Sequence, residues 1–276
     1  MSVYNIAIIA RKEVRDSLRN RWFWLYAGAF AVLALGLSYL SLAGTEMSGL
    51  AGFGRTTAGL VNLVLLIVPL MALNIAAASV AGERERGTLA YLLSQPVSRG
   101  EVLWGKYLGL AAALLAALAG GFGLSGAIIA WHGGAASAGS YALLVALTFV
   151  LALSMLSVGL LVSVLARKAS VAIGVSIVLW LVLTLLSDLA LMGSTIAFKL
   201  RVDELFSLAL LNPLQVFKMS VLSGIHATLD VLGPAGTYAR QRFGTALGAV
   251  FAVALGIWVI APLVLAHLVF LRKGAA

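Results

Sequence analysis

The sequence contains no cysteine, and only 11% of its 276 residues are charged. The absence of cysteine excludes disulfide bonds, thiolate metal ligands and cysteine nucleophiles. A soluble globular protein has about 25% charged and about 45–50% apolar residues. Here 62% of the chain is hydrophobic and the mean hydropathy is +1.06. This composition excludes an ordinary soluble enzyme and a disordered chain.

The few charged residues leave long stretches without Asp, Glu, Lys or Arg between them. The five longest are Trp22–Thr45, Thr56–Gly82, Tyr107–Ala166, Ala169–Ser187 and Phe243–Leu271. A spanning helix needs about 20 apolar residues, so the third stretch, with 60 residues, predicts two helices joined at the glycine-rich segment 131–140. We therefore predict one all-α membrane domain over residues 1–276. Its six transmembrane helices are expected at 22–43, 58–81, 107–130, 141–165, 169–192 and 245–270.

The charge balance of 19 basic and 10 acidic residues gives a net charge of +9. In a soluble domain this excess would suggest nucleic-acid binding. Here the basic residues cluster between uncharged stretches, as Lys and Arg do in cytoplasmic loops of membrane proteins. With both termini in the cytoplasm, 13 basic residues lie in inner segments and 6 in outer segments. We therefore predict cytoplasmic termini, residues 193–244 outside, and a lipid bilayer rather than nucleic acid as the partner.

The first uncharged stretch has a cleaved signal peptide as its alternative. Ser41-Leu42-Ala43 resembles a cleavage site. The 24 uncharged residues of this stretch exceed the roughly 7–15 of a signal peptide's hydrophobic region, which favours a retained anchor.

Residues 3–21 have the pattern of an amphipathic helix. Ile6, Ile9 and Val14 fall on one side of a helical wheel, and Lys12 and Arg15 fall on the other. A basic amphipathic helix ahead of a first span is typical of the membrane surface. A solvated basic leader is the alternative.

The loop 82–106 predicts another short helix, over Thr88–Gln95, which Pro96 ends. Ser98 and Glu101 form a capping box for the next span. The apolar face of the short helix consists of Leu89, Leu92 and Leu93. An apolar face beside dense charge predicts a docking surface for a partner. Packing of the same face against the membrane surface is the alternative.

The segment 193–244 is the longest stretch outside the predicted spans, and it is partly apolar. A seventh span over 205–229 would place Pro213 and Lys218 at mid-bilayer, where a charged group is expensive. We therefore predict short helices that lie in the outer interface or re-enter the membrane, and that shield the outer end of the bundle.

Two motifs suggest enzyme chemistry. Gly100–Tyr107 nearly matches a Walker A loop, which needs Ser or Thr after its lysine and a strand before it. Tyr107 cannot replace that hydroxyl and the segment begins a membrane helix, so we predict no nucleotide site. The segment 123–126 resembles the G-x-S-G of rhomboid-type proteases. Ser125 is expected near the outer face and His267 near the inner end, so we predict that the chain is not an enzyme.

The predicted spans contain few polar or metal-ligating side chains. Asp188 is the single carboxylate inside a span, and its depth favours the outer interface. Met71 and Met155 fall near mid-span and are candidates for a transport path, because thioethers suit Cu(I). Methionine also fills cores, and no tight Met or His cluster exists, so we predict no metal site. A face for packing against another helix, in the same chain or across a dimer, is predicted from Gly244, Gly248, Ala252 and Gly256.

The loop after the second span carries the most specific pattern. It runs Glu83-x-Glu85-x-Gly87-Thr88-Leu89, then Leu92-Leu93-Ser94-x-Pro96-x-Ser98-Arg99, then Gly105-Lys106. Together with the order of helices, this pattern resembles the permeases of type-2 ABC transporters over essentially the whole chain. The resemblance implies a homodimer in the cell inner membrane with two cytoplasmic ATPase subunits. Those subunits would hold ATP and Mg²⁺, and this chain would bind no cofactor of its own.

The same resemblance implies that the short helix is a coupling helix, seated in a groove of the ATPase. The residues expected to serve ATPase coupling are Glu83, Glu85, Gly87, Thr88, Leu89, Leu92, Leu93, Pro96 and Arg99.

Two further stretches, Arg11–Trp22 and Asn212–Tyr238, resemble a subgroup of these permeases that serves copper-site maturation of nitrous oxide reductase. That resemblance implies a periplasmic accessory protein on residues 193–244. The residues expected to bind it or to form a lid are Asn212, Pro213, Phe217 and Lys218. A generic type-2 exporter of a lipid, drug or glycan is the alternative. A secondary transporter would need paired intramembrane charges or broken helices, and only Asp188 is available.

Overall fold

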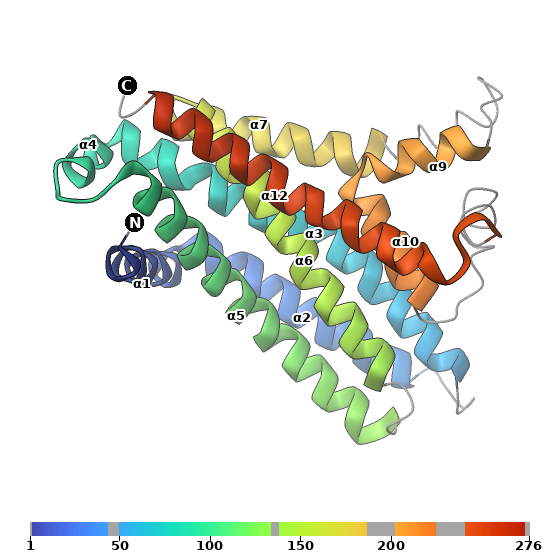
Figure 1. The fold of residues 1–276 in the computed structure, drawn as a ribbon. Helices are drawn as coiled ribbons and strands as arrows, with labels where there is room; N and C mark the ends of the chain where they lie inside the picture. The colour runs from blue at the N-terminus through green and yellow to red at the C-terminus, as the bar shows by residue number, and fades with distance from the viewer. Residues whose placement is uncertain (1, 44–49, 134–137, 187–201, 225–240, 274–276) are drawn as a thin grey trace.

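The computed structural model describes residues 2–43, 50–133, 138–186, 202–224 and 241–273, and the regular elements within these ranges are helices. They are α1 (Val3–Arg19), α2 (Arg21–Ala43), α3 (Leu50–Glu85), α4 (Thr88–Leu93), α5 (Arg99–Gly133), α6 (Ala138–Leu165), α7 (Ala169–Leu181) with a π-helical turn (Val182–Leu186), α9 (Val202–Leu210), α10 (Pro213–Gly224), and a 3₁₀ turn (Gly244–Ala246) leading into α12 (Leu247–Lys273). The long helices run alongside one another, and α1 is seen end-on (Figure 1). The start of α1, α4 and the end of α12 lie at one end of the bundle, and α9 lies toward the other.

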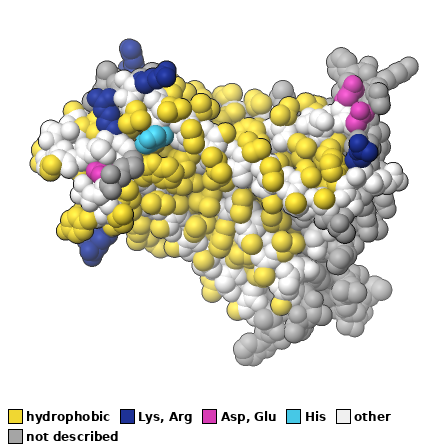
Figure 2. Space-filling view, viewed as in Figure 1, with side chains coloured by type: hydrophobic (Ala, Val, Ile, Leu, Met, Phe, Trp, Pro, Cys, Tyr) yellow, Lys and Arg dark blue, Asp and Glu magenta, His cyan; other side chains and the backbone are white. Residues whose placement is uncertain are grey.

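The bundle has the dimensions and surface of a membrane protein. Within the described residues, α2, α3, α5, α6 and α12 are long and apolar enough to cross a membrane. Figure 2 shows hydrophobic side chains over the middle of the molecule, with Lys and Arg gathered mainly at one end. The predicted all-α membrane architecture is therefore confirmed. The predicted fifth span, 169–192, is described only through Leu186 and forms a shorter apolar helix.

Two helices extend further than the sequence predicted. α3 has 36 residues and includes Glu83–Glu85, where the prediction stopped at residue 81. α5 begins at Arg99 rather than at residue 107. The predicted bounds ended where charge begins, because an unpaired charge is costly in a bilayer. The structure bonds these charges to neighbouring helices, so each helix continues through them.

The segment after the π-helical turn forms two short helices rather than a straight seventh span. α9 and α10 meet at an angle of 110°, the geometry of a broken span or a re-entrant loop. Asn212 caps α10 by accepting the Leu214 N–H at 2.9 Å, and Pro213 occupies the first helical position, where no N–H is needed. The short-helix prediction is therefore confirmed for the described part of this segment.

The core is centred on α6, which packs against α3, α5, α10 and α12. α3 and α6 approach closely at Gly159, where a Cβ atom would lie 2.6 Å from the Leu73 carbonyl oxygen. Met71 and Met155 are fully buried in this core. A smaller cluster around Phe206 and Phe251 joins α9 and α10 to α12.

Candidate functional site

The short helix α4 is joined to α3 by a tight reversal at Gly87. This glycine has φ = 74°, a left-handed conformation that other residues rarely adopt. Its N–H donates to the Arg84 carbonyl at 3.1 Å, and the Thr88 hydroxyl donates to the Glu83 carbonyl at 3.2 Å. Gly87 and Thr88 therefore fix the direction in which α4 leaves α3.

The other end of the loop is fixed by the predicted capping box. The Glu101 N–H donates to the Ser98 hydroxyl at 3.2 Å, and the Ser98 N–H donates to the Glu101 carboxylate at 2.9 Å. The same carboxylate accepts the Asn5 amide at 3.2 Å, which joins α1 to this point. Arg99 donates to the Leu271 carbonyl at 2.7 Å and so connects α5 to the end of α12. Pro96 is exposed between α4 and the cap.

The three leucines of α4 do not form an open face. Leu89 is 1% exposed, and Leu92 and Leu93 are half-buried against the main core. The sequence period places them on one side of the helix, and that side is turned toward the helical bundle of the same chain. The outward side of α4 instead presents Tyr91, which is 73% exposed. A partner that meets α4 in this arrangement meets Tyr91 first.

Three consecutive charged residues at the end of α3 are each bonded to a different element. Glu83 forms ion pairs with Lys12 of α1 and Lys106 of α5. Arg84 donates to the Val164 and Ala166 carbonyls, which satisfies the C-terminal end of α6.

Glu85, the third of these residues, accepts the Ala169 N–H at 2.9 Å and so caps the first turn of α7. A carboxylate at a helix N-terminus is also favoured by the helix dipole. The end of α3 is therefore connected to α1, α5, α6 and α7.

Lys12, Glu13, Glu83 and Lys106 form what we call the charge cluster. Lys106 is 0% exposed, and its Nζ lies 2.7 Å from Glu13 Oε1 and 2.9 Å from Glu83 Oε2. Burial opposes the charge of Lys12, but its hydrogen bond to Glu83 and the nearby Glu13 carboxylate outweigh burial, so the pKa of Lys12 is raised. The charge cluster thus holds α1 against α3 and α5.

Two glycines bring α1 into this position: Gly105, which the sequence pattern included for another reason, and Gly109, which it did not include. A Cβ atom on Gly109 would lie 2.5 Å from the Ala10 carbonyl oxygen, and one on Gly105 would lie 2.7 Å from Ile9 Cβ. Their four-residue spacing is the signal that could have revealed this contact, because small residues at that spacing let helices approach closely.

A polar cavity of about 480 Å³ opens beside the charge cluster, between α1 and α3. Its walls include Asp16 and Arg19 from α1, Ser79 from α3, and Arg86 in the turn that follows α3. The cavity, α4 and the charge cluster belong to one end of the molecule. This end therefore combines the exposed side of α4 with the side chains that connect it to the helices.

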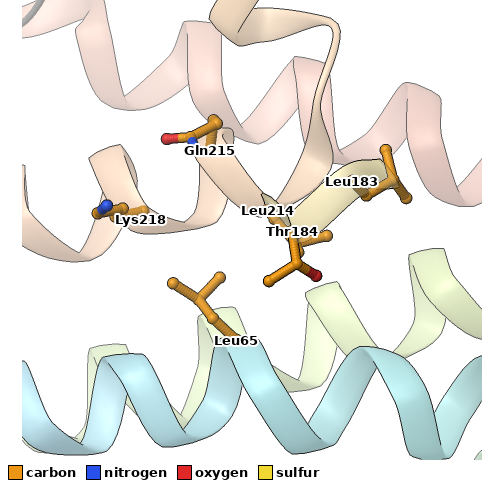
Figure 3. A pocket seen from close by; sticks show the side chains of 6 residues that line it. All are labelled: Leu65, Leu183, Thr184, Leu214, Gln215 and Lys218. Carbon is orange, nitrogen blue, oxygen red and sulfur yellow. The ribbon is translucent and has the colours of Figure 1, made fainter. Parts of the chain in front are cut away.

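The predicted lid residues are placed by α10 and the π-helical turn. Asn212 donates to the Leu183 carbonyl at 2.7 Å, so its side chain joins α10 to that turn while it caps α10. Pro213 and Phe217 are buried. Lys218 is partly exposed and lines a small cavity with Leu65, Leu183, Thr184, Leu214 and Gln215 (Figure 3). The cavity, about 20 Å³, has room for a single water molecule.

The remaining motif residues have other surroundings. Ser125 is fully buried, and its hydroxyl lies 2.6 Å from that of Ser38, so it joins α5 to α2. Gly248 and Ala252 are exposed on α12. Within the described part of the chain, a Cβ on Gly244, Gly248 or Gly256 would meet no atom within 4 Å. This face therefore packs against no described helix of its own chain. Asp188 lies outside the described residues.

Comparison with known proteins gives one family match and two similar relatives. The sequence profile of the family described as "ABC-2 family transporter protein" matches residues 7–275. The chain is 32% identical over 271 residues to a "Probable ABC transporter permease protein NosY" of Pseudomonas aeruginosa. It is 31% identical over 271 residues to a protein of the same description from Stutzerimonas stutzeri. Each alignment covers 96% of this chain and 97% of the relative.

Proposed function

Because the chain belongs to the ABC-2 family of transporter proteins, we propose that it is the membrane permease through which a separate cytoplasmic ATPase drives conformational change across the inner membrane. The observation that carries this proposal is the junction at the end of α3. There Glu83, Arg84 and Glu85 bond to α1, α5, α6 and α7 in three consecutive residues. A displacement of α4 reaches all of these helices through one short segment.

The residues predicted to serve coupling then divide into two roles. Leu89, Leu92 and Leu93 hold α4 on the bundle, so that a force on α4 moves the bundle instead of bending the loop. Gly87 and Thr88 fix the angle between α4 and α3. We assign contact with the ATPase to the outward side of α4, where Tyr91 is exposed.

The mechanism that follows is mechanical. ATP and Mg²⁺ on the ATPase subunits would close the ATPase pair, and the closure would press on α4 of each permease. Closely packed helices respond to such a push by shifting as rigid bodies. The charge cluster would carry the shift to α1, and the Arg84 and Glu85 contacts would carry it to α6 and α7.

The test is co-purification of the ATPase with permease variants from detergent. Tyr91→Asp places a charge on the outward side of α4, and we expect ATPase binding to fall more than tenfold, about 1.4 kcal/mol. The matched control is Leu211→Asp, because Leu211 is similarly exposed but lies between α9 and α10 at the other end. Retention of the ATPase by Tyr91→Asp at the level of the control would show that α4 is not the coupling element.

We further propose that the permease acts as a homodimer and that it serves copper-site maturation of nitrous oxide reductase. The open face of Gly248 and Ala252 supports a contact between copies, since no described helix of the same chain covers it. Similarity to the two NosY proteins, and the Asn212–Tyr238 stretch, support the copper-maturation role and a periplasmic accessory protein on residues 193–244.

The copper role is tested in a host that makes nitrous oxide reductase. Deletion of the permease should lower the copper content of the purified reductase, and the wild-type gene should restore it. Normal copper content in the deletion strain would exclude the maturation role and leave the generic exporter of a lipid, drug or glycan as the function.

A further inference from the structure

A second cavity lies on a different side of the molecule, between α2 and α5. It has a volume of about 350 Å³, and none of the side chains that line it is charged. Its floor consists mainly of small residues, including Ala27, Gly28 and Ala31 of α2 and Ala116 and Gly120 of α5. Trp24 at its mouth uses its indole N–H to donate to the Leu18 carbonyl at 2.8 Å. The cavity is therefore an apolar groove with its polar groups already bonded.

The length of the groove matches one leaflet of a bilayer. Its α5 lining runs from Ala113 to Leu124, about 16 Å at 1.5 Å per residue. That is about half of a hydrocarbon core of roughly 30 Å. Leu18 and Trp24 place the mouth at the junction of α1 and α2, where an interfacial tryptophan is expected. The groove thus runs from the membrane surface on the α1 side toward the bilayer centre.

Basic residues surround the mouth. Arg15 and Arg11 precede Leu18 by three and seven residues, so they share its side of α1. Arg21 begins α2 immediately beyond. All three are exposed, and none takes part in an ion pair between side chains of the described residues. Positive charge at this depth attracts anionic lipid headgroups.

We propose that this groove binds an anionic phospholipid, with one acyl chain between α2 and α5 and its phosphate against Arg15 and Arg21. The alternative occupant, a helix of a second copy, would bring two sets of these arginines together, whereas an anionic headgroup complements them. The proposal needs only that the chain resides in a membrane. It does not depend on the coupling role proposed for α4.

Glycines on the groove floor provide a direct test. Gly28→Leu and Gly120→Leu fill the groove, and a Cβ at either position would meet no described atom within 4 Å, so neither substitution opposes folding. The matched control is Gly36→Leu, which is also on α2 and equally unobstructed but does not line the groove. Each protein is purified with its partner subunits, incubated with vesicles of phosphatidylglycerol or phosphatidylcholine, and analysed by native mass spectrometry.

We expect the wild type and Gly36→Leu to retain phosphatidylglycerol, and both groove-filling variants to lose it without a change in melting temperature. Arg15→Gln and Arg21→Gln should each lower phosphatidylglycerol affinity about fivefold and leave phosphatidylcholine retention unchanged. The control for charge is Arg167→Gln, between α6 and α7.

Three outcomes would overturn the proposal. Equal lipid retention in all variants would show that the groove is not the site. Displacement of the lipid by inorganic phosphate alone would show an anion site without a chain-binding groove. Loss of contact between two copies in Gly28→Leu, with lipid retention unchanged, would assign the groove to a second copy.

Discussion

The amino group of Lys106 is buried inside the molecule and forms ion pairs with the carboxylates of Glu13 and Glu83. Such an ion pair contributes little net stability, because removing both charges from water costs about as much as their attraction returns. Breaking it has a large effect, because the charges that remain are buried without a partner. The residue therefore determines where α1 sits more than how stable the bundle is.

Lys106→Met should destabilise the protein by about 3–5 kcal/mol, since it leaves two buried carboxylates whose remaining ion-pair partner among the described residues is Lys12. The triple variant that also carries Glu13→Gln and Glu83→Gln should recover part of this loss. Thermal unfolding in detergent measures the stability of the single and the triple variant. The control is Lys168→Met, at the exposed start of α7. A Lys106→Met protein as stable as this control would contradict the burial of a paired charge.

The position of Lys106 also shows where prediction from sequence ends. The uncharged stretches identified the helices, because hydropathy depends on composition alone. The charged ends of α3 and α5 were assigned to a loop, because their partners are distant in sequence: Glu83 meets Lys12 and Lys106. Likewise the spacing of Leu89, Leu92 and Leu93 identified an apolar face but not what covers it. Gly105 and Gly109 were detectable by spacing, but not the helix that crosses them.

Among the elements, α10 has one side chain that both caps the helix and bonds it to a neighbouring segment. Asn212 caps the helix and also donates to the Leu183 carbonyl in the π-helical turn. A π-helical turn changes the backbone hydrogen-bond pattern, and Asn212 bonds to a carbonyl within it. The bend of 110° between α9 and α10 falls at this residue.

Asn212→Ala should destabilise α10 by about 1–2 kcal/mol through loss of the cap alone. The Leu214 amide, which donates to Asn212, should then exchange with deuterium faster than in the wild type. Ser207→Ala on the exposed side of α9 provides the control. It also removes one local side-chain hydrogen bond, which the Ser207 hydroxyl donates to the Asp203 carbonyl. Unchanged exchange at Leu214 would show that Pro213 alone sets the start of the helix.

For the whole molecule, the arrangement of ends agrees with the distribution of basic residues. The start of α1, α4 and the end of α12 lie together in Figure 1, and the distribution of basic residues predicts that this end faces the cytoplasm. Three of the features described above lie near this end: α4, the charge cluster and the mouth of the apolar groove. The α9–α10 pair belongs to the opposite end.

Reporter fusions test this orientation directly. Fusions after Gln95 and Ala276 should report the cytoplasm, and a fusion after Leu211 should report the periplasm. The expectation follows from 13 basic residues in the inner segments against 6 in the outer segments. A cytoplasmic reading after Leu211 would contradict the predicted topology and require a different number of crossings.

The length of α3 has a mechanical consequence. With 36 residues α3 measures about 54 Å, well beyond a hydrocarbon core of roughly 30 Å. Its charged end therefore extends beyond the hydrocarbon core. Pro69 lies inside the helix near its middle, where a proline removes one backbone hydrogen bond and favours bending. The part of α3 from Pro69 to Glu85 is about 24 Å long, and a tilt of this part by about 5° moves its Glu85 end by about 2 Å. That displacement is of the size by which packed helices shift when proteins switch state.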